Sequence, residues 1–375
     1  MAKDINQEKF PEETMLKLEI FAECFREWLP VFIHNQYIKG ALIFDFFAGS
    51  GKDIEGNMGS PLILLNEARG KNCEAVKKNK KLILFTFNEK NENKYNELKN
   101  NVESYISQCA TQNKCGKECV YRLSYNQEDF KDFLLNEKLI TYLSDYNYAK
   151  FVLLDQYGFK QIDEDVFLKF VNFPKTDFIF FISSSFIQRF KEVPATKLYI
   201  DTSKIQFNEN RPEDCHRLIA KYYRDLIPAG KEYYTHHFTI KKGANYWGLI
   251  FGTNHSLGME KFLKVCWTQD PISGESSFNI DNDFTEESLF FDKESTAKKQ
   301  YVSNIVKQKI LSREITSNAV GLKFALENGC MPKLFTDVVK ELEKEGKIKR
   351  TGSTSYSSSN IHKVETYDIV LMEKL

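Results

Sequence analysis

The chain has 375 residues, 42% hydrophobic and 14% aromatic, which is enough to fill the core of one large domain and a smaller one. Its 52 Lys and Arg residues balance 52 Asp and Glu residues, so net charge gives no argument for nucleic acid and any basic surface must be local. The N-terminus is polar and no apolar run approaches roughly 18 residues, which predicts no signal peptide and no membrane contact. Eight cysteines are too few for a disulfide scaffold, so we expect a cytoplasmic protein with reduced thiols.

The first half of the chain alternates apolar strands with helices, which predicts an α/β fold. Residues 17–29 carry apolar side chains at helical spacing, typical of a helix that covers a sheet and carries no site. Ser60 is expected to cap a helix whose first position is Pro61. Strands are predicted at 41–46, 82–87, 120–124, 151–155 and 177–182, with helices at 91–105 and 127–135.

The second half continues with a helix, a hairpin and a change of composition. We predict a helix at 211–226, paired strands at 233–240 and 246–251, and a helix at 258–267. Acidic residues dominate 275–294, which is typical of a linker or a surface excursion. The predicted domains are therefore an α/β domain at 1–270, an acidic linker at 271–300 and a further domain at 301–375.

The last predicted domain has the element order of a winged helix. Helices are expected at 301–311, 317–328 and 332–345, followed by strands at 347–350 and 366–372 around a Ser/Gly-rich tip at 351–360. It holds more Lys and Arg than Asp and Glu, so it is mildly basic. A winged helix can bind nucleic acid or a protein, and the sequence leaves both open.

The stretch that organises the chain is an apolar strand that ends in an acid and a small-residue turn. It reads Ile43-Phe44-Asp45-Phe46-Phe47-Ala48-Gly49-Ser50-Gly51. Gly49 and Gly51 let a ligand lie against the backbone, and open α/β sheets bind ligands at such strand ends. The phosphate-loop and dinucleotide glycine patterns are both absent. The turn resembles motif I of class I S-adenosylmethionine-dependent methyltransferases, which implies that Asp45, Phe47, Ala48, Gly49 and Gly51 contact S-adenosylmethionine; the alternative is a plain strand and turn.

Two further acids follow later strands. Glu89 ends the second strand, where a carboxylate can accept from both ribose hydroxyls of an adenosine cofactor. The alternative is a solvated acid at a helix start, where the helix dipole favours it. Asp129 follows the third strand, where folds of this kind contact adenine, and is a further cofactor-binding candidate.

The fourth strand ends in Asp155-Gln156-Tyr157-Gly158, beside the first strand, where class I methyltransferases hold the substrate. Base amino-methyltransferases carry a related motif there, with a carboxylate that accepts from the amine and an aromatic ring that stacks on the base. Asp155 and Tyr157 are therefore the candidate catalytic residues. The alternative is a strand-end Asp and a buried Tyr.

Three cysteines share one predicted loop, Cys109, Cys115 and Cys119. Their spacing could mark a metal site, but zinc sites with short pairs use two to four intervening residues and no fourth ligand is evident nearby. We expect an incidental cysteine-bearing loop and no metal.

The motifs together resemble the three-Cys-motif partner protein (TcmP) family. The features that carry the resemblance are residues 17–28, 45–51, Gly59-Ser60-Pro61, 155–158 and Gly252-Thr253-Asn254-His255. The resemblance implies a Rossmann-like class I methyltransferase sheet closed by an antiparallel strand, and association with a separate three-Cys-motif, radical-SAM-like protein. The cysteines of that name belong to the partner. Family members commonly have Pro where this chain has Gln156.

Three functions follow as hypotheses. The first is a methyltransferase that uses S-adenosylmethionine on DNA or RNA, with its partner, in a modification or phage-defence system. The second is a non-catalytic scaffold of the same fold that binds nucleic acid or the partner. The third is a nucleotide-sensing regulator without catalysis.

Overall fold

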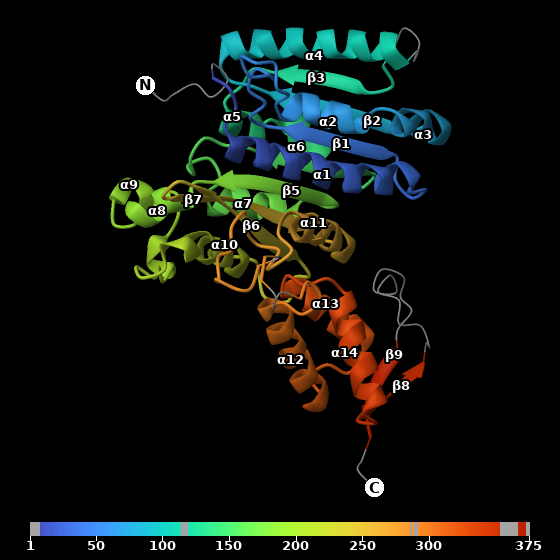
Figure 1. Ribbon diagram of the computed structural model, residues 1–375. Coiled ribbons are helices and arrows are strands. Elements are labelled where there is room, and N and C mark those ends of the chain that lie inside the picture. Colours follow the sequence, from blue (N-terminus) through green and yellow to red (C-terminus); the bar gives the residue numbers. More distant parts are fainter. Residues whose placement is uncertain (1–7, 114–118, 286, 289–291, 353–366, 373–375) are drawn as a thin grey trace. The chain divides into compact units, whose positions relative to one another are not determined.

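The computed structural model describes residues 8–113, 119–285, 287–288, 292–352 and 367–372 (Figure 1). The chain contains a seven-stranded sheet of order β3-β2-β1-β4-β5-β7-β6, and all of its strands except most of β6 belong to the first body of the chain, residues 1–233 and 240–254. Strands β1 to β5 run parallel and β7 is antiparallel to β5. The strands are β1 Gly40–Asp45, β2 Leu82–Asn88, β3 Arg122–Asn126, β4 Tyr148–Leu154, β5 Thr176–Ile182, β6 Tyr234–Lys242 and β7 Asn245–Thr253.

This arrangement confirms the predicted Rossmann-like class I methyltransferase sheet, including its antiparallel closing strand. The helices between the strands are α1 Glu12–His34, α2 Ser60–Ala68, α3 Lys71–Asn79, α4 Glu92–Asn113, α5 Phe130–Leu134, α6 Glu137–Ser144, α7 Glu164–Asn172, α8 Ser184–Arg189, α9 Pro194–Lys197 and α10 Cys215–Asp225, with 3-10 turns η2 Thr202–Lys204 and η3 Pro212–Asp214. No helix in the described part of the chain is long and apolar enough to cross a membrane.

The strand register brings the candidate site residues to one edge of the sheet. Asp45 of β1 lies level with Phe87 of β2 and with Leu153 of β4. Glu89 comes two positions after Phe87 in the chain, and Asp155 comes two positions after Leu153. The carboxyl ends of three adjacent strands therefore carry an acid each, and this edge is where open α/β sheets bind ligands.

Side chains alternate between the two faces of the sheet, as the period of a strand requires. One face of β1 and its neighbours packs against α1, where Phe25 contacts Phe85 and Phe151 with ring centroids 6.0 and 5.2 Å apart. Helix α1 is thus the covering helix that the apolar spacing predicted, although it is longer at both ends. Helices α2, α3 and α4 lie on the same side as α1 (Figure 1).

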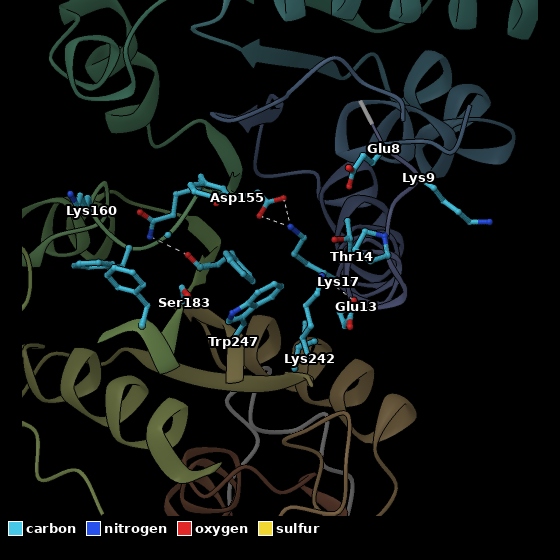
Figure 2. A pocket seen from close by; sticks show the side chains of 18 residues that line it. Glu8, Lys9, Glu13, Thr14, Lys17, Asp155, Lys160, Ser183, Lys242 and Trp247 are labelled. Carbon is cyan, nitrogen blue, oxygen red and sulfur yellow. Dashed lines mark hydrogen bonds and ion pairs between the residues drawn. The ribbon is translucent and has the colours of Figure 1, made fainter. Parts of the chain in front are cut away.

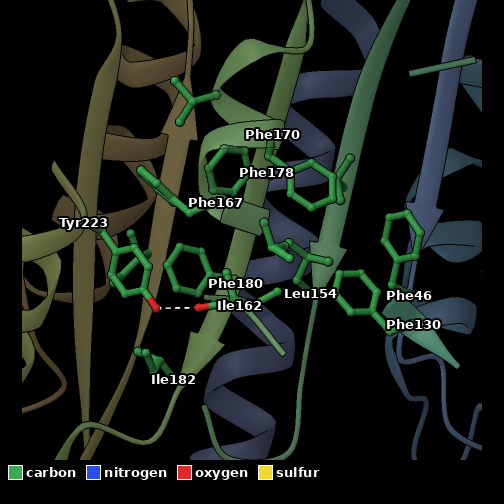
Figure 3. Packing of buried hydrophobic residues seen from close by; sticks show 14 of the residues in the cluster. Phe46, Phe130, Leu154, Ile162, Phe167, Phe170, Phe178, Phe180, Ile182 and Tyr223 are labelled. Atoms are coloured by element: carbon green, nitrogen blue, oxygen red, sulfur yellow. Dashed lines mark hydrogen bonds between the residues drawn. The ribbon is translucent and has the colours of Figure 1, made fainter. Parts of the chain in front are cut away.

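The opposite face holds an aromatic core (Figure 3). Phe46 packs edge-on against Phe130 of α5 at 5.3 Å, and Phe167 of α7 packs edge-on against Phe178 of β5 at 5.8 Å. Tyr223 of α10 is buried and donates a 2.6 Å hydrogen bond to the Ile162 carbonyl, which satisfies its hydroxyl. Phe-rich strands thus fill this layer without a ligand, because rings that meet edge-on or offset pack closely.

A buried polar contact joins α1 to the sheet. Trp28 donates a 2.6 Å hydrogen bond from its indole nitrogen to Asp177, whose side chain lies between β5 and α1. Burial raises the pKa of Asp177 to about 6, while bonds from Thr253 and Trp28 and the charge of Lys150 act in the opposite direction. A carboxylate here is tolerated because it is hydrogen-bonded.

The second body of the chain comprises residues 234–239 and 255–375. Its elements are α11 Ser256–Gln269, α12 Ala297–Leu311, α13 Asn318–Glu327, α14 Lys333–Lys344, β8 Ile348–Gly352 and β9 Tyr367–Leu371. Three helices and a hairpin follow α11 in the predicted order, and Phe335 packs so closely on Gly321 that a Cβ there would meet its ring at 2.0 Å. The identity of this body as a winged helix stays a prediction, and most of the tip at 351–360 lies outside the described residues.

The predicted linker is built into this second body. The Asp270 carboxylate accepts hydrogen bonds from the backbone of Ile272, Ser273, Glu275 and Ser276, which folds the chain into a tight loop. Trp267 of α11 donates a 2.9 Å bond to the Gly329 carbonyl. The compact body therefore begins before the expected boundary at residue 271, because α11 packs on α13. An independent module at 301–375 stays a prediction.

Asp177 gives stability a defined pH dependence. The pKa of Asp177 is about 6 in the folded protein, above its ordinary value of 3.8. As pH rises, Asp177 therefore loses its proton in the unfolded chain first, and this lowers the stability of the folded state. We expect the free energy of unfolding to fall by up to about 3 kcal/mol between about pH 4 and pH 6 from this group alone. Asp177→Asn should flatten that decrease in urea titrations across this range. Asp145→Asn, at a half-buried carboxylate whose pKa is lowered by bonds from Asn147, should leave the decrease with pH in place. An unchanged slope in Asp177→Asn would refute the assignment.

Candidate functional site

The small-residue turn after β1 has the backbone that its glycines predict. Gly49 and Gly51 have φ of 61° and 82°, in the left-handed region that glycine adopts without strain. The Gly59 amide donates a 2.8 Å bond to the Gly51 carbonyl, and a Cβ on Gly59 would lie 3.2 Å from Gly51. The turn is therefore closed by two glycine backbones in contact, and residues 52–58 form a loop between them.

Asp45 is fully buried at the start of this turn. It accepts a 2.6 Å bond from the Ser60 hydroxyl and a 3.3 Å bond from the Phe47 amide. Burial raises its pKa to about 7, and the negative charges of Asp155 and Glu89 act in the same direction. The prediction that Ser60 caps α2 is wrong: Gly59 is the N-cap, and the Ser60 hydroxyl turns to Asp45 because an unbonded carboxylate there would be costly.

Glu89 reaches the glycine turn across 40 residues of sequence. Its Oε2 accepts a 3.0 Å bond from the Gly49 amide, and its Oε1 accepts a 2.8 Å bond from the Asn91 amide. The second bond is the helix-start contact of the alternative interpretation. The first bond joins the acid to the predicted cofactor turn, and each oxygen retains a lone pair that a ribose hydroxyl could use.

Asp129 has a structural task. It caps α5 by accepting a 2.9 Å bond from the Lys131 amide, and it pairs with Lys90 at 2.9 Å. The bond from Lys90 is the main reason that the pKa of Asp129 is lowered. The following ring, Phe130, packs on Phe47 of the glycine turn at 5.0 Å. Asp129 thus holds the segment after β3 against the turn, and a contact to adenine stays a prediction.

Asn88 was not singled out by the sequence, yet it joins these loops. Its buried side chain donates to the carbonyls of Phe46 and Glu128 at 3.2 and 3.0 Å and accepts from the Glu128 amide at 3.2 Å. Its own carbonyl accepts a 3.0 Å bond from the Ala48 amide. One buried amide therefore fixes the distance between the turn after β1 and the loop after β3. No signal in the sequence distinguishes it from any other strand-end Asn.

A pocket of about 830 Å³ opens beside this edge of the sheet (Figure 2). Asp155 and Tyr157 both line it, as do aromatic residues of β5 and β7 and the N-terminal segment. Its walls include Glu8, Lys9, Glu13, Lys17, Asp155, Gln156, Tyr157, Lys160, Phe181, Phe186, Lys242 and Trp247. The two predicted catalytic residues thus share one cavity. Tyr157 is 71% exposed, so its ring is available and the alternative of a buried Tyr is wrong.

Lys17 of α1 points at Asp155 across the pocket (Figure 2). Its ammonium donates to both carboxylate oxygens, at 2.7 and 2.6 Å, and the two side chains are only 11% and 18% exposed. The helix was expected only to cover the sheet, and its first turns also line this pocket. Helical periodicity marks the apolar face, but it cannot show which polar residue at the helix start meets another strand's end.

Gln156 shapes this turn where the resemblance predicts a proline. Its side chain is buried, donates a 3.1 Å bond to the Phe181 carbonyl of β5, and accepts a 2.8 Å bond from the Gln161 amide. Gly158 follows with φ of 88°, and its carbonyl accepts from the Ser183 amide. Two side-chain bonds thus shape a turn that Pro would shape through its ring.

The predicted cysteine loop is only partly described, and its first cysteine is not in a loop: Cys109 lies on α4, which continues past the predicted helix end at residue 105. Cys109 and Cys119 are half-buried, and Cys115 lies outside the described residues. Among the residues that the structure describes, no three His, Cys, Asp or Glu side chains are grouped to hold a metal.

No known protein family matches this sequence, and no curated protein matches it. Several solved methyltransferases are similar in structure. Trm1 from Pyrococcus horikoshii, in complex with S-adenosyl-L-methionine, is 10% identical with a TM-score of 0.39 over 95% of this chain and 90% of that chain. The METTL16 methyltransferase domain is 11% identical with a TM-score of 0.31 over 62% and 67%. The O-methyltransferase TomG from Streptomyces achromogenes is 7% identical with a TM-score of 0.32 over 65% and 90%. The fold class rests on the strand order and the antiparallel β7 described above.

The Asn88 contacts predict a measurable cost for their loss. Asn88→Ala leaves two carbonyls and one amide of the strand-end loops without their partner in a buried place, so we expect the free energy of unfolding to fall by about 1–3 kcal/mol. Denaturant titration measures this loss. Asn100→Ala, on the exposed face of α4, is the matched control and should change stability little. Equal stability of the two variants would contradict the role of Asn88.

Proposed function

We propose that the chain is an S-adenosylmethionine-binding, methyltransferase-like protein that acts on nucleic acid. The single observation that carries the proposal is the meeting of Gly49, Glu89 and Asp155 at one edge of the sheet, with the amide of Gly49 bonded to Glu89. The adenosine part would lie along the glycine turn, with its ribose diol at Glu89. When bound, S-adenosylmethionine supplies an electrophilic methyl group on a sulfonium.

The charges at this edge fit a cation. Asp45, Glu89 and Asp155 interact closely enough that the last two raise the pKa of the first. Lys17 balances Asp155, which leaves the side of the glycine turn negative. A positively charged sulfonium would relieve the mutual repulsion of these carboxylates, whereas an anionic phosphate would add to it. The donor set therefore supports S-adenosylmethionine over a dinucleotide.

The acceptor would enter the 830 Å³ pocket. Asp155 would accept a hydrogen bond from an amine and orient its lone pair, and the exposed ring of Tyr157 would stack on a nucleic-acid base. The association with a three-Cys-motif partner and a role in modification or phage defence come from the family resemblance of residues 45–51 and 155–158. They are part of this proposal.

A scaffold without catalysis is the second candidate, and the Lys17–Asp155 pair favours it. Both oxygens of Asp155 already accept from the Lys17 ammonium. An acceptor amine must therefore share an occupied carboxylate, whereas a scaffold has no such requirement. A protein of this kind would bind nucleic acid or the partner and transfer nothing.

Cofactor binding should depend on the ionisation of Asp45. Its pKa of about 7 means that roughly half of the protein carries a neutral Asp45 at pH 7, and a nearby sulfonium favours the ionised form. We expect the affinity for S-adenosylmethionine to rise from pH 6 to pH 8, with proton release on binding at pH 7. Calorimetry in buffers of different ionisation enthalpy measures both quantities.

Two controls sharpen this experiment. S-adenosylhomocysteine has the same amino acid and adenosine parts but no sulfonium, so its affinity should change less over the same range. Asp45→Asn should remove the additional pH dependence while the Ser60 hydroxyl keeps a partner. A pH profile for S-adenosylmethionine that matches that of S-adenosylhomocysteine would contradict the role of Asp45.

Methyl transfer separates the enzyme from the scaffold. We expect the wild-type protein, with its three-Cys-motif partner supplied, to transfer a labelled methyl group to cellular DNA or RNA. Asp155→Ala should abolish transfer while cofactor binding persists, because the glycine turn is separate. If the wild type transfers no methyl group, the enzyme hypothesis is excluded and the scaffold hypothesis remains. If both proteins transfer equally, only the proposed role of Asp155 is contradicted.

A further inference from the structure

The pocket beside Asp155 has the ingredients of a cation site. Phe181 and Trp247 meet edge to face at 5.7 Å, and both line the cavity together with the Asp155 carboxylate. Aromatic faces next to an acid are the chemistry that recognises ammonium groups. Taken alone, these walls would suit a lysine side chain or a quaternary ammonium as the methyl acceptor.

Both cation positions are already occupied by the protein itself. The Lys17 ammonium lies 4.8 Å from the centre of the Phe181 ring while it bonds both oxygens of Asp155. The Lys242 ammonium lies 5.1 Å from the Trp247 ring and 3.5 Å from Glu13. Phe181 and Trp247, the two rings nearest these carboxylates, thus each face a lysine, and each of these lysines faces an acid.

Lys17 is held firmly in this place. It projects from the first turns of α1, and its side chain is 11% exposed. The segment before α1 is tied to the loop after the glycine turn, because the buried Phe10 amide donates a 2.8 Å bond to Asp53. A ligand cation would have to displace a buried, doubly bonded ammonium from a helix whose start is anchored on both sides.

We propose that Lys17 is a specificity-determining residue that fills the cation position of the pocket, with Lys242 in the same role at Trp247. The group that reaches Asp155 is then a neutral hydrogen-bond donor on a flat ring, such as an exocyclic amine of a base. Cationic amines are disfavoured at Asp155 because a second cation there would lie beside the Lys17 ammonium and would have to share the carboxylate that Lys17 already bonds. This inference rests on the proposed function, because it concerns the acceptor of the proposed reaction. Its argument uses Lys17 and Lys242, which have no part in the methyl transfer itself.

The test compares a neutral and a cationic probe in the absence of cofactor. Cytidine and guanosine, which carry an exocyclic amine but are not part of the cofactor, represent the neutral rings, and choline represents the cation; ligand-observed NMR titration measures their affinities. The wild type should bind at least one nucleoside and should bind choline at least about tenfold more weakly. In Lys17→Met, Asp155 loses its partner, so choline affinity should rise at least about tenfold, which corresponds to about 1.4 kcal/mol.

Lys99→Met is the matched control, because Lys99 also lies over an aromatic ring, 5.7 Å from that of Tyr95, but on α4 and outside the pocket. It should leave choline binding as in the wild type. A folded Lys17→Met with no gain for choline would overturn the proposal. Should that variant fail to fold, the wild-type comparison decides: choline that binds as tightly as the better nucleoside, or nucleosides that do not bind, would also overturn it.

This outcome is separable from that of the proposed function. Neither probe needs S-adenosylmethionine, so a protein that binds no cofactor or transfers no methyl group can still pass or fail the test of Lys17. Conversely, a protein that transfers methyl groups to a cationic acceptor would keep its function and lose this inference.

Discussion

Three carboxylates at the ends of three adjacent parallel strands are the constraint on which this site depends. The register sets Asp45 level with the ends of β2 and β4, so Glu89 and Asp155 must flank the glycine turn. Like charges this close cannot all ionise without cost. The fold answers with separate partners for each acid: Ser60 for Asp45, backbone amides for Glu89, and the Lys17 ammonium for Asp155.

These partners come from parts of the chain that are distant in sequence, and they link the glycine turn to the pocket. The segment before α1 meets Asp53 in the loop after the turn, and Lys17 meets Asp155 at the mouth of β4. Asn88 joins the turn to the loop after β3. The glycine turn, the segment before α1 and the pocket are therefore joined by hydrogen bonds and one ion pair.

Charged side chains of helix α14, in the second body, form ion pairs with neighbours of opposite charge. Lys333 and Lys340 of α14 both face Asp337 on the same helix, and Lys307 of α12 faces Glu341. The charges on the described part of α14 are thus mixed in sign and largely paired.

Much of the fold could be predicted from local patterns in the sequence. Local patterns indicated all five parallel strands, and an acid lies at the end of three of them, β1, β2 and β4. The glycine turn, Glu89 and the Asp155–Tyr157 pair were found at these strand ends because strand, turn and ligand chemistry are encoded in adjacent residues. The partners of those residues, Lys17, Asn88 and Trp247, were not predicted from the sequence. Neither were the bond from Ser60 to Asp45 and the inclusion of residues 270–277 in the second body. Each depends on a contact between segments far apart in the chain, and the same polar residue on a helix or strand end would look identical in sequence with or without it. The sequence alone determined which residues could form a site, and the tertiary structure decided which of them face one another and with what charge.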